Sequence, residues 1–202
     1  MKAPSLMRGF MTVGGWTLAS RLLGFGRDIM IAATLGAGPV AEAFLIAFSL
    51  PNMFRRFFAE GAFNMAFVPM FSKKLEGGDD PVTFARDAFA GLATVLIAVT
   101  LIAQLLMPGL VLLMASGFAE DERLGLAVNY GRLAFPYILF ISLAALLSGV
   151  LNASGRFVAA AAAPVLLNLV LIGSLVLARR MGWDAGLALA WGVPLAGILQ
   201  LA

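Results

Sequence analysis

Residues 88–119 read AFAGLATVLIAVTLIAQLLMPGLVLLMASGFA, and no side chain in this stretch carries a charge. About 20 apolar residues in an α-helix cross the roughly 30 Å hydrocarbon core of a bilayer. In lipid, every backbone N–H and C=O needs a partner within the protein, and a helix supplies these partners within one segment. We therefore expect this stretch to contribute a transmembrane helix.

Five further apolar stretches accompany this one. Of the 202 residues, 61% are hydrophobic and 12% are charged, whereas charged residues make up about 25% of an average soluble domain. The alternating segments of about ten residues that form membrane β-barrels are missing from the sequence. We expect an all-α, polytopic membrane protein with six transmembrane helices, at about 9–35, 40–70 with a kink at Pro51, 85–115, 128–152, 157–178 and 185–202. The sixth stretch reaches the last residue without a flanking charge, so we expect the chain to be cut there.

Basic residues in the short loops predict the orientation, because cytoplasmic loops carry an excess of Lys and Arg. With the N-terminus inside, six basic residues fall on the cytoplasmic side and three on the outer side. The inner set is Lys2, Arg8, Lys73, Lys74, Arg86 and Arg156, and the outer set is Arg123, Arg179 and Arg180. We expect a multi-pass protein with a cytoplasmic N-terminus.

The chain contains no Cys and no His. This excludes cysteine nucleophiles, Cys/His metal sites and His-based triads. We expect no metal, no cofactor and no enzymatic activity. The basic residues are few and are not interleaved with aromatic side chains, so a nucleic-acid partner is not expected.

Three charged side chains interrupt the first apolar stretch: Arg21, Arg27 and Asp28. A charge near the bilayer centre costs about 2.5–3.5 kcal/mol on insertion scales, so such residues usually face a protein interior or a water-filled cavity. At 100° per residue, Arg21 and Asp28 lie within about 20° of each other, and Arg27 lies about 120° from Arg21. We expect one arginine to pair with Asp28 and the other to be available for a ligand. Snorkelling to the interface is the alternative.

The second apolar stretch carries Glu42 near its outer start, and Arg55 and Arg56 follow Pro51. Arg56 and Glu60 are four residues apart, which predicts a helical ion pair, and Arg55 points to another side of the helix. The alternative is that both arginines anchor the helix at the cytoplasmic rim.

Arginines that line a cavity suit a phosphate or diphosphate, because the planar guanidinium donates two parallel hydrogen bonds to such a group. Gly24 and Gly26 make the first helix bendable, and plain helix packing is their alternative role. Asn168, with Pro164 on the same helix, predicts either a polar kink at the cavity or an interhelical hydrogen bond. We see no carboxylate pair or nucleophile motif that would indicate hydrolysis.

Several motifs, taken together, resemble those of the MurJ (MviN) lipid II flippases. They are SRLLGFGRD at 20–28, LPNMFRRFFAEGAF at 50–63, AFVP at 66–69, FPYI at 135–138, and the stretches 151–157 and 163–168. The resemblance covers nearly the whole chain. It implies the N-terminal six-helix lobe of a two-lobe flippase from the multidrug/oligosaccharidyl-lipid/polysaccharide exporter superfamily, with the C-terminal lobe absent from this chain.

The resemblance also implies a substrate and a mechanism. Lipid II, an undecaprenyl-pyrophosphate-linked peptidoglycan precursor, would move from the inner to the outer leaflet of the bacterial inner membrane by alternating access, for cell-wall synthesis and cell shape. In that family cavity arginines hold the lipid diphosphate, and the matching positions are Arg21, Arg27 and Arg55. Asp28, Glu42, Arg56 and Glu60 would tune the cavity by pairing, and Gly24, Gly26 and Pro51 would allow bending. The family usually has Asp where this chain has Glu42, and no coupling ion is indicated.

Three alternatives stay open. A flippase for another polyprenyl-linked glycan, or a cation-coupled exporter of the same superfamily, would share the fold, although an exporter of drugs would favour acidic cavity residues. A membrane scaffold would not need the cavity charges. An intramembrane hydrolase or glycosyltransferase has little support in the residues.

Overall fold

The computed structural model describes residues 3–58 and 62–202, apart from the side chains of 3–10, 12, 57–58 and 62–64. The described residues form helices and no strand, which confirms the all-α class. The elements are α1 (Ala3–Leu35), α2 (Pro39–Phe58), α3 (Ala62–Gly77), α4 (Pro81–Met114), the 3₁₀ helix η1 (Ser116–Phe118), α5 (Glu122–Ala134), α6 (Tyr137–Ala153), α7 (Val158–Met181) and α8 (Ala185–Leu201).

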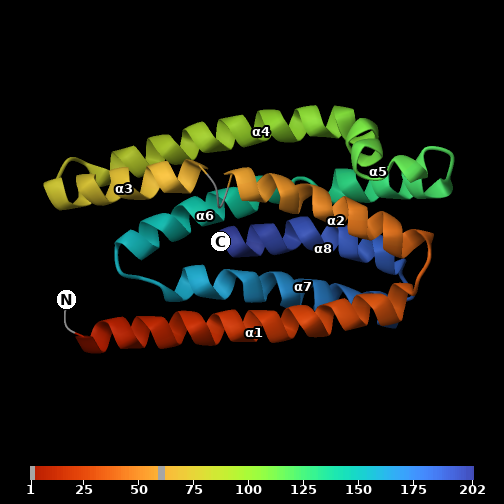
Figure 1. Ribbon diagram of the computed structural model, residues 1–202, viewed down its shortest axis with the longest axis horizontal. Coiled ribbons are helices and arrows are strands. Elements are labelled where there is room, and N and C mark those ends of the chain that lie inside the picture. Colours follow the sequence, from red (N-terminus) through yellow and green to blue (C-terminus); the bar gives the residue numbers. More distant parts are fainter. Residues whose placement is uncertain (1–2, 59–61) are drawn as a thin grey trace.

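These helices run back and forth along the long axis of the molecule (Figure 1). Within the described residues they make six passes, because α2 is followed in the same direction by α3 and α5 by α6. The start of α1 and the α3–α4 and α6–α7 connections lie at one end, and the α1–α2 and α7–α8 connections lie at the other (Figure 1). Three described segments are long and apolar enough to cross a membrane: Pro81–Met114, Glu122–Ala153 and Val158–Met181.

Two helices begin earlier than the apolar pattern predicted, because an aspartate caps each N-terminus. Asp80 accepts a hydrogen bond from the backbone N–H three residues on at 3.2 Å, and Asp121 from the N–H two residues on at 2.9 Å. Such caps satisfy backbone donors that have no partner within the first helical turn. α4 therefore starts at Pro81 and α5 at Glu122, whereas the uncharged runs that we used to place them start later.

The structure describes two helices within the second apolar stretch, and residues 59–61 between them lie outside the described residues. α2 ends at Phe58 and α3 begins at Ala62, and Pro51 lies buried inside α2. The side-chain amide of Asn52 donates to the Phe48 carbonyl oxygen at 2.8 Å, next to the position where proline lacks an N–H. The predicted kink at Pro51 stays a prediction, since α2 continues through this residue.

A proline does divide the fourth stretch, which was predicted as one helix at 128–152. α5 ends at Ala134 and α6 begins at Tyr137. Because Pro136 has no N–H, the Arg132 carbonyl oxygen loses its helical donor, and the helix ends here. The pass is therefore made by two helices joined at Phe135 and Pro136.

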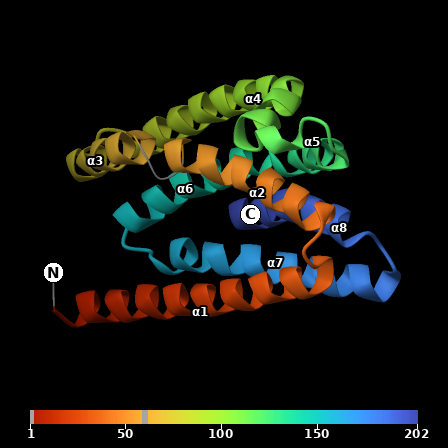
Figure 2. The same cartoon turned by 45° about the vertical axis from the view of Figure 1, so that its right-hand side comes forward.

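Small residues let α8 pack in the interior of the bundle, in contact with α2, α5, α6 and α7 (Figure 2). A Cβ added at Gly186 would lie 2.5 Å from the Tyr130 hydroxyl oxygen of α5, and one at Gly197 would lie 2.8 Å from the Tyr137 ring of α6. Glycine at these positions allows the close helix approach that is typical of membrane bundles.

α1 lies at the edge of the bundle and packs mainly on α7 (Figure 2). Its other side carries Leu18, Leu22, Phe25 and Ile29, which are 52–69% exposed. Spacings of four, three and four residues place these side chains on one face of the helix. This apolar face is open to lipid or to another protein segment.

Candidate ligand cavity

Arg27 is held where α1 meets α7. Its Nη1 donates to Asn168 Oδ1 at 2.9 Å, and its Nε and Nη2 donate to Asp28 Oδ1 at 2.9 and 2.7 Å. Its guanidinium carbon lies 5.6 Å from the ring centroid of Phe48 on α2. Arg27 stands eight residues before Leu35, the last residue of α1, or about 12 Å along the helix. Through these contacts Arg27 links α1 to α7 and α2, about 12 Å from the end of α1.

Asn168 is 4% exposed, and both ends of its amide are hydrogen-bonded. Oδ1 accepts from Arg27, and Nδ2 donates to the Ser20 carbonyl oxygen at 2.9 Å. A Cβ added at Gly24 would lie 3.6 Å from Nδ2, so Gly24 gives the amide room. Of the two roles predicted for Asn168, the structure shows the interhelical hydrogen bond, and Gly24 serves the packing of α1 on α7.

Arg21 and Asp28 lie on the exposed side of α1. Within the part of the chain that the structure describes, Arg21 makes no hydrogen bond or ion pair. It stands 14 residues before Leu35, about 21 Å along the helix. Arg21 is thus a charged group far from the end of α1, on the exposed side of this helix.

Arg55 lines an open cavity of about 540 Å³ bordered by α2, α3, α6, α7 and α8. This volume is within the range of about 300–1,000 Å³ that small-molecule sites occupy. The cavity is lined by Asn52, Arg55, Val68, Tyr137, Ile141, Ala144, Ala145, Ser148, Gly149, Asn152, Ala160, Ala163, Pro164, Leu167 and Gln200. Arg55 is the one charged residue in this set, so the cavity combines a single positive charge with neutral walls.

Three polar residues of this cavity, Ser148, Asn152 and Gln200, were not predicted as site residues. Ser148 and Asn152 belong to the mostly apolar helix α6 and Gln200 to the apolar helix α8, and only the packing of these helices around α2 brings the three side chains to the cavity of Arg55. The spacing of Ser148 and Asn152 was the available signal, because residues four apart share one helix face.

Other predicted residues lie elsewhere. Arg27 does not line the cavity, although Asn168, its partner, follows Pro164 of the cavity wall by one helical turn. Arg56 is exposed on α2, and its predicted partner Glu60 lies outside the described residues. Gly26 sits within the unbroken helix α1 and has open space at its Cβ position.

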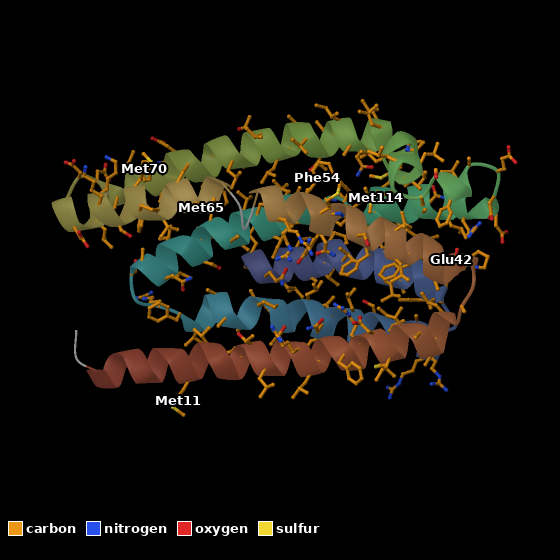
Figure 3. All side chains as sticks on the ribbon, viewed as in Figure 1. Met11, Glu42, Phe54, Met65, Met70 and Met114 are labelled. Carbon is orange, nitrogen blue, oxygen red and sulfur yellow. The ribbon has the colours of Figure 1, made fainter. Side chains whose placement is uncertain are left out.

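Glu42 lies at the end of the bundle near the α1–α2 turn (Figure 3). Its Oε2 pairs with Arg123 Nη1 of α5 at 2.5 Å. Arg123 also pairs with Asp121 at 2.7 Å, and its guanidinium carbon lies 4.6 Å from the centroid of the Phe118 ring. The structure thus corrects the expectation that Glu42 pairs within the cavity, since this carboxylate joins α2 to α5 at the end of the bundle.

The chemistry that this arrangement supports is binding. Among residues 3–58 and 62–202, no group of three or more Asp or Glu side chains is placed to hold a metal ion. A guanidinium in a partly apolar cavity attracts an anion, and the apolar wall accommodates apolar groups beside it. The fold and the cavity define a membrane-embedded helical lobe suited to an anionic amphiphile.

Comparison with known proteins agrees with the assignment to a membrane-embedded helical lobe. Residues 31–202 match the family described as lipid II flippase MurJ. The chain is 50% identical to a probable lipid II flippase MurJ of Rhizobium meliloti, across 98% of this chain and 38% of that protein. It is 41% identical to the lipid II flippase MurJ of Burkholderia cenocepacia, across 97% of this chain and 39% of that protein.

A solved structure is also similar. It is a lipid II flippase MurJ in an inward closed conformation, with a TM-score of 0.80 and 26% identity over 94% of this chain and 40% of that one. The chain belongs to the MurJ lipid II flippase family. It spans about 38% of the length of the Rhizobium relatives that it matches.

Proposed function

We propose that this chain forms the N-terminal lobe of a lipid II flippase of the bacterial inner membrane. Together with a second lobe, it moves the undecaprenyl-pyrophosphate-linked precursor from the cytoplasmic to the periplasmic leaflet by alternating access. The observation that carries the proposal is the position of Arg55, which is the one charged side chain among the described residues that line a cavity between five helices. A diphosphate is the anion that such a lipid-linked sugar carries.

The position of Arg21 along α1 supports a diphosphate site that Arg21 shares with Arg55. Arg21 precedes the end of α1 by 14 residues, and Arg55 follows the start of α2 by 16. The two helices are joined by a short turn and run in opposite directions (Figure 1), so both arginines lie at a similar height, about 21 and 24 Å from the turn. An uncompensated guanidinium on a lipid-facing surface is costly, which favours a polar cavity between the lobes beside this face of α1.

Arg27 has a different role in this proposal. Its contacts with Asp28 and Asn168 use much of its donor capacity and hold it in place. It contributes positive potential to the diphosphate site and fixes α1 on α7. The predicted bending at Gly26 and Pro51 belongs to the same alternating-access proposal.

The proposal is tested with the full-length protein in proteoliposomes that contain a fluorescent lipid II. Arg55→Ala is expected to lower the flipping rate about 10- to 100-fold, since a charge-assisted hydrogen bond contributes about 1.5–3 kcal/mol. Arg55→Lys should retain part of the activity, because it keeps the charge without the planar fork. Arg179→Ala, which removes an exposed arginine at the other end of α7, is the matched control. Wild-type flipping by Arg55→Ala would refute the assignment, and equal transport of other polyprenyl-linked glycans would point to a broader substrate class.

The proposed orientation has its own test. The chain contains no cysteine, so single cysteines report loop positions cleanly. With a cytoplasmic N-terminus, a membrane-impermeant maleimide should label Glu120→Cys in intact spheroplasts and Asp79→Cys only after lysis. The reverse pattern would invert the topology.

A further inference from the structure

A second cavity, of about 310 Å³, forms an open groove between α7 and α8, which lie side by side (Figure 2). The described residues that line this groove are distinct from those of the Arg55 cavity. They are Ser174, Leu177, Trp183, Asp184, Leu187, Ala188, Trp191, Gly192 and Leu195. Leu187, Trp191 and Leu195 are spaced by four residues along α8 and are 43–59% exposed. One edge of the groove is therefore an apolar row that is open to lipid.

The turn between α7 and α8 forms one end of this groove. Gly182 ends α7 with a φ of 69°, and the Trp183 N–H donates to the Ala178 carbonyl oxygen at 2.9 Å. This places the Trp183 side chain, which is 56% exposed, at the mouth of the groove. Tryptophan is enriched where the hydrocarbon core of a bilayer meets the headgroups. The groove therefore runs from that boundary toward the interior of the bilayer.

Two charges of opposite sign stand at this end. Asp184 Oδ1 accepts from the Leu187 N–H at 2.6 Å and from the Tyr130 hydroxyl at 3.5 Å, whereas Oδ2 accepts no hydrogen bond from the described residues. Arg180 follows Leu177 of the groove by three residues, so the two side chains are neighbours on the surface of α7. Arg180 is exposed and makes no hydrogen bond or ion pair within the described part of the chain. The groove thus ends in a guanidinium and a carboxylate oxygen that are both available to a ligand.

This charge pattern narrows the ligand class. A guanidinium suits a phosphate, and a carboxylate next to it suits a primary ammonium, which donates charge-assisted hydrogen bonds. A phosphoglycerol head has no cation for Asp184. A phosphocholine head has no N–H and needs an aromatic cage, whereas Trp183 and Trp191 stand eight residues apart, about 12 Å along a helix axis. Of these three heads, phosphoethanolamine uses both charges.

We propose that the groove between α7 and α8 binds a phospholipid with a phosphoethanolamine head. The phosphate bonds to Arg180 and the ammonium group to Asp184 Oδ2, while an acyl chain lies along the apolar row of α8. This lipid site is separate from the Arg55 cavity and does not depend on the proposed transport. It also gives Arg180 a partner at the outer end of the bundle, where the proposed orientation leaves basic residues uncommon.

Native mass spectrometry of the full-length protein with three phospholipids tests this site. The lipids have identical acyl chains and carry phosphoethanolamine, phosphocholine or phosphoglycerol heads. The wild type should bind the phosphoethanolamine lipid about 3- to 10-fold more tightly than either of the others, which is the effect of one exposed, charge-assisted hydrogen bond. Asp184→Asn keeps a helix-capping side chain and should abolish this preference. Arg180→Gln should weaken the binding of all three lipids, because each has a phosphate.

A neighbouring arginine supplies the matched control. Arg179 lies about 160° around α7 from Leu177 of the groove, so Arg179→Gln removes the same charge from another side of the helix and should change no affinity. Equal wild-type affinities for the phosphoethanolamine and phosphocholine lipids, or a preference that survives Asp184→Asn, would overturn the proposal. Equal losses in Arg180→Gln and Arg179→Gln would also overturn it, because they would indicate attraction to net charge alone.

A second measurement is made in a bilayer. Phospholipids with brominated acyl chains quench the emission of nearby tryptophans, and the difference between the wild type and Trp191→Phe isolates the emission of Trp191. In nanodiscs that contain the same low fraction of brominated lipid, the phosphoethanolamine lipid should quench Trp191 more than the phosphocholine lipid does. Asp184→Asn should remove this difference. Equal quenching of wild-type Trp191 by the two lipids would contradict a headgroup-specific site in the groove.

Discussion

Gln104 of α4 and Arg132 of α5 each supply the hydrogen bond that a proline has removed from the other. Pro108 follows Gln104 by four residues and Pro136 follows Arg132 by four, so neither carbonyl oxygen receives its helical N–H. Gln104 Nε2 donates to the Arg132 carbonyl oxygen at 2.8 Å, and Arg132 Nε donates to the Gln104 carbonyl oxygen at 3.3 Å. This reciprocal pair joins two proline-interrupted helices where lipid offers no substitute donor.

Replacing Gln104 with leucine should therefore destabilise the protein by about 1–3 kcal/mol, because the Arg132 carbonyl oxygen is left without a donor where lipid supplies none. In a Pro136→Ala background the loss should be smaller, because residue 136 then supplies an N–H to Arg132. A double-mutant cycle on the thermal unfolding midpoint in nanodiscs measures this coupling. Additive losses would show that the side-chain bond does not compensate for the proline.

The close approach of α8 to α5 predicts a contrast between two glycines. In Gly186→Ala the new methyl group would lie 2.5 Å from the Tyr130 hydroxyl oxygen and 2.7 Å from Val40. Tyr130 is only 4% exposed, so we expect a loss of about 1–3 kcal/mol from overpacking. Gly91→Ala on α4 meets no atom within 4 Å and should leave the unfolding midpoint unchanged or slightly raised. Similar midpoints for the two variants would contradict this packing.

The hydrogen bond between Arg27 of α1 and Asn168 of α7 predicts that substitutions of these two residues have coupled effects on stability. Asn168→Leu removes the acceptor of Arg27 and should lower stability by about 1–3 kcal/mol. The same substitution should cost much less in an Arg27→Leu background, where no guanidinium is left without its partner. Asn129→Leu is the matched control, because Asn129 is exposed on α5. The measurement is urea or thermal unfolding of the detergent-solubilised protein, and equal costs in both backgrounds would disprove the link.

Asp121, in the loop before α5, predicts a dependence on pH. Hydrogen bonds from the backbone N–H and then the side chain of Arg123 hold its pKa below the ordinary 3.8. The folded state favours the carboxylate, so its stabilisation is complete above about pH 4 and is lost as the pH falls through the lowered pKa. Asp121→Asn keeps a capping side chain that does not titrate. Between about pH 5 and pH 3, the unfolding midpoint of the wild type should therefore fall more steeply than that of the variant, and equal slopes would exclude this contribution.

Much of the fold can be predicted from where charged residues stand along the sequence. A bilayer penalises each charge according to depth, so the uncharged run at 88–119 and its counterparts indicate where the chain crosses. The same rule singled out Arg21, Arg27 and Arg55 as unusual. Helix ends were less well predicted, since the cap at Asp80 depends on local hydrogen bonding.

The partners of the charged residues could be seen only in three dimensions. Asn168 lies 141 residues from Arg27, and Arg123 lies 81 residues from Glu42. Ser148 and Gln200 reach the cavity of Arg55 from separate helices. Whether a side chain enters lipid is a property of its own segment and can be inferred from the amino acids there. Which side chains meet depends on how each helix is rotated and which faces pack together, and that is an outcome of the whole bundle.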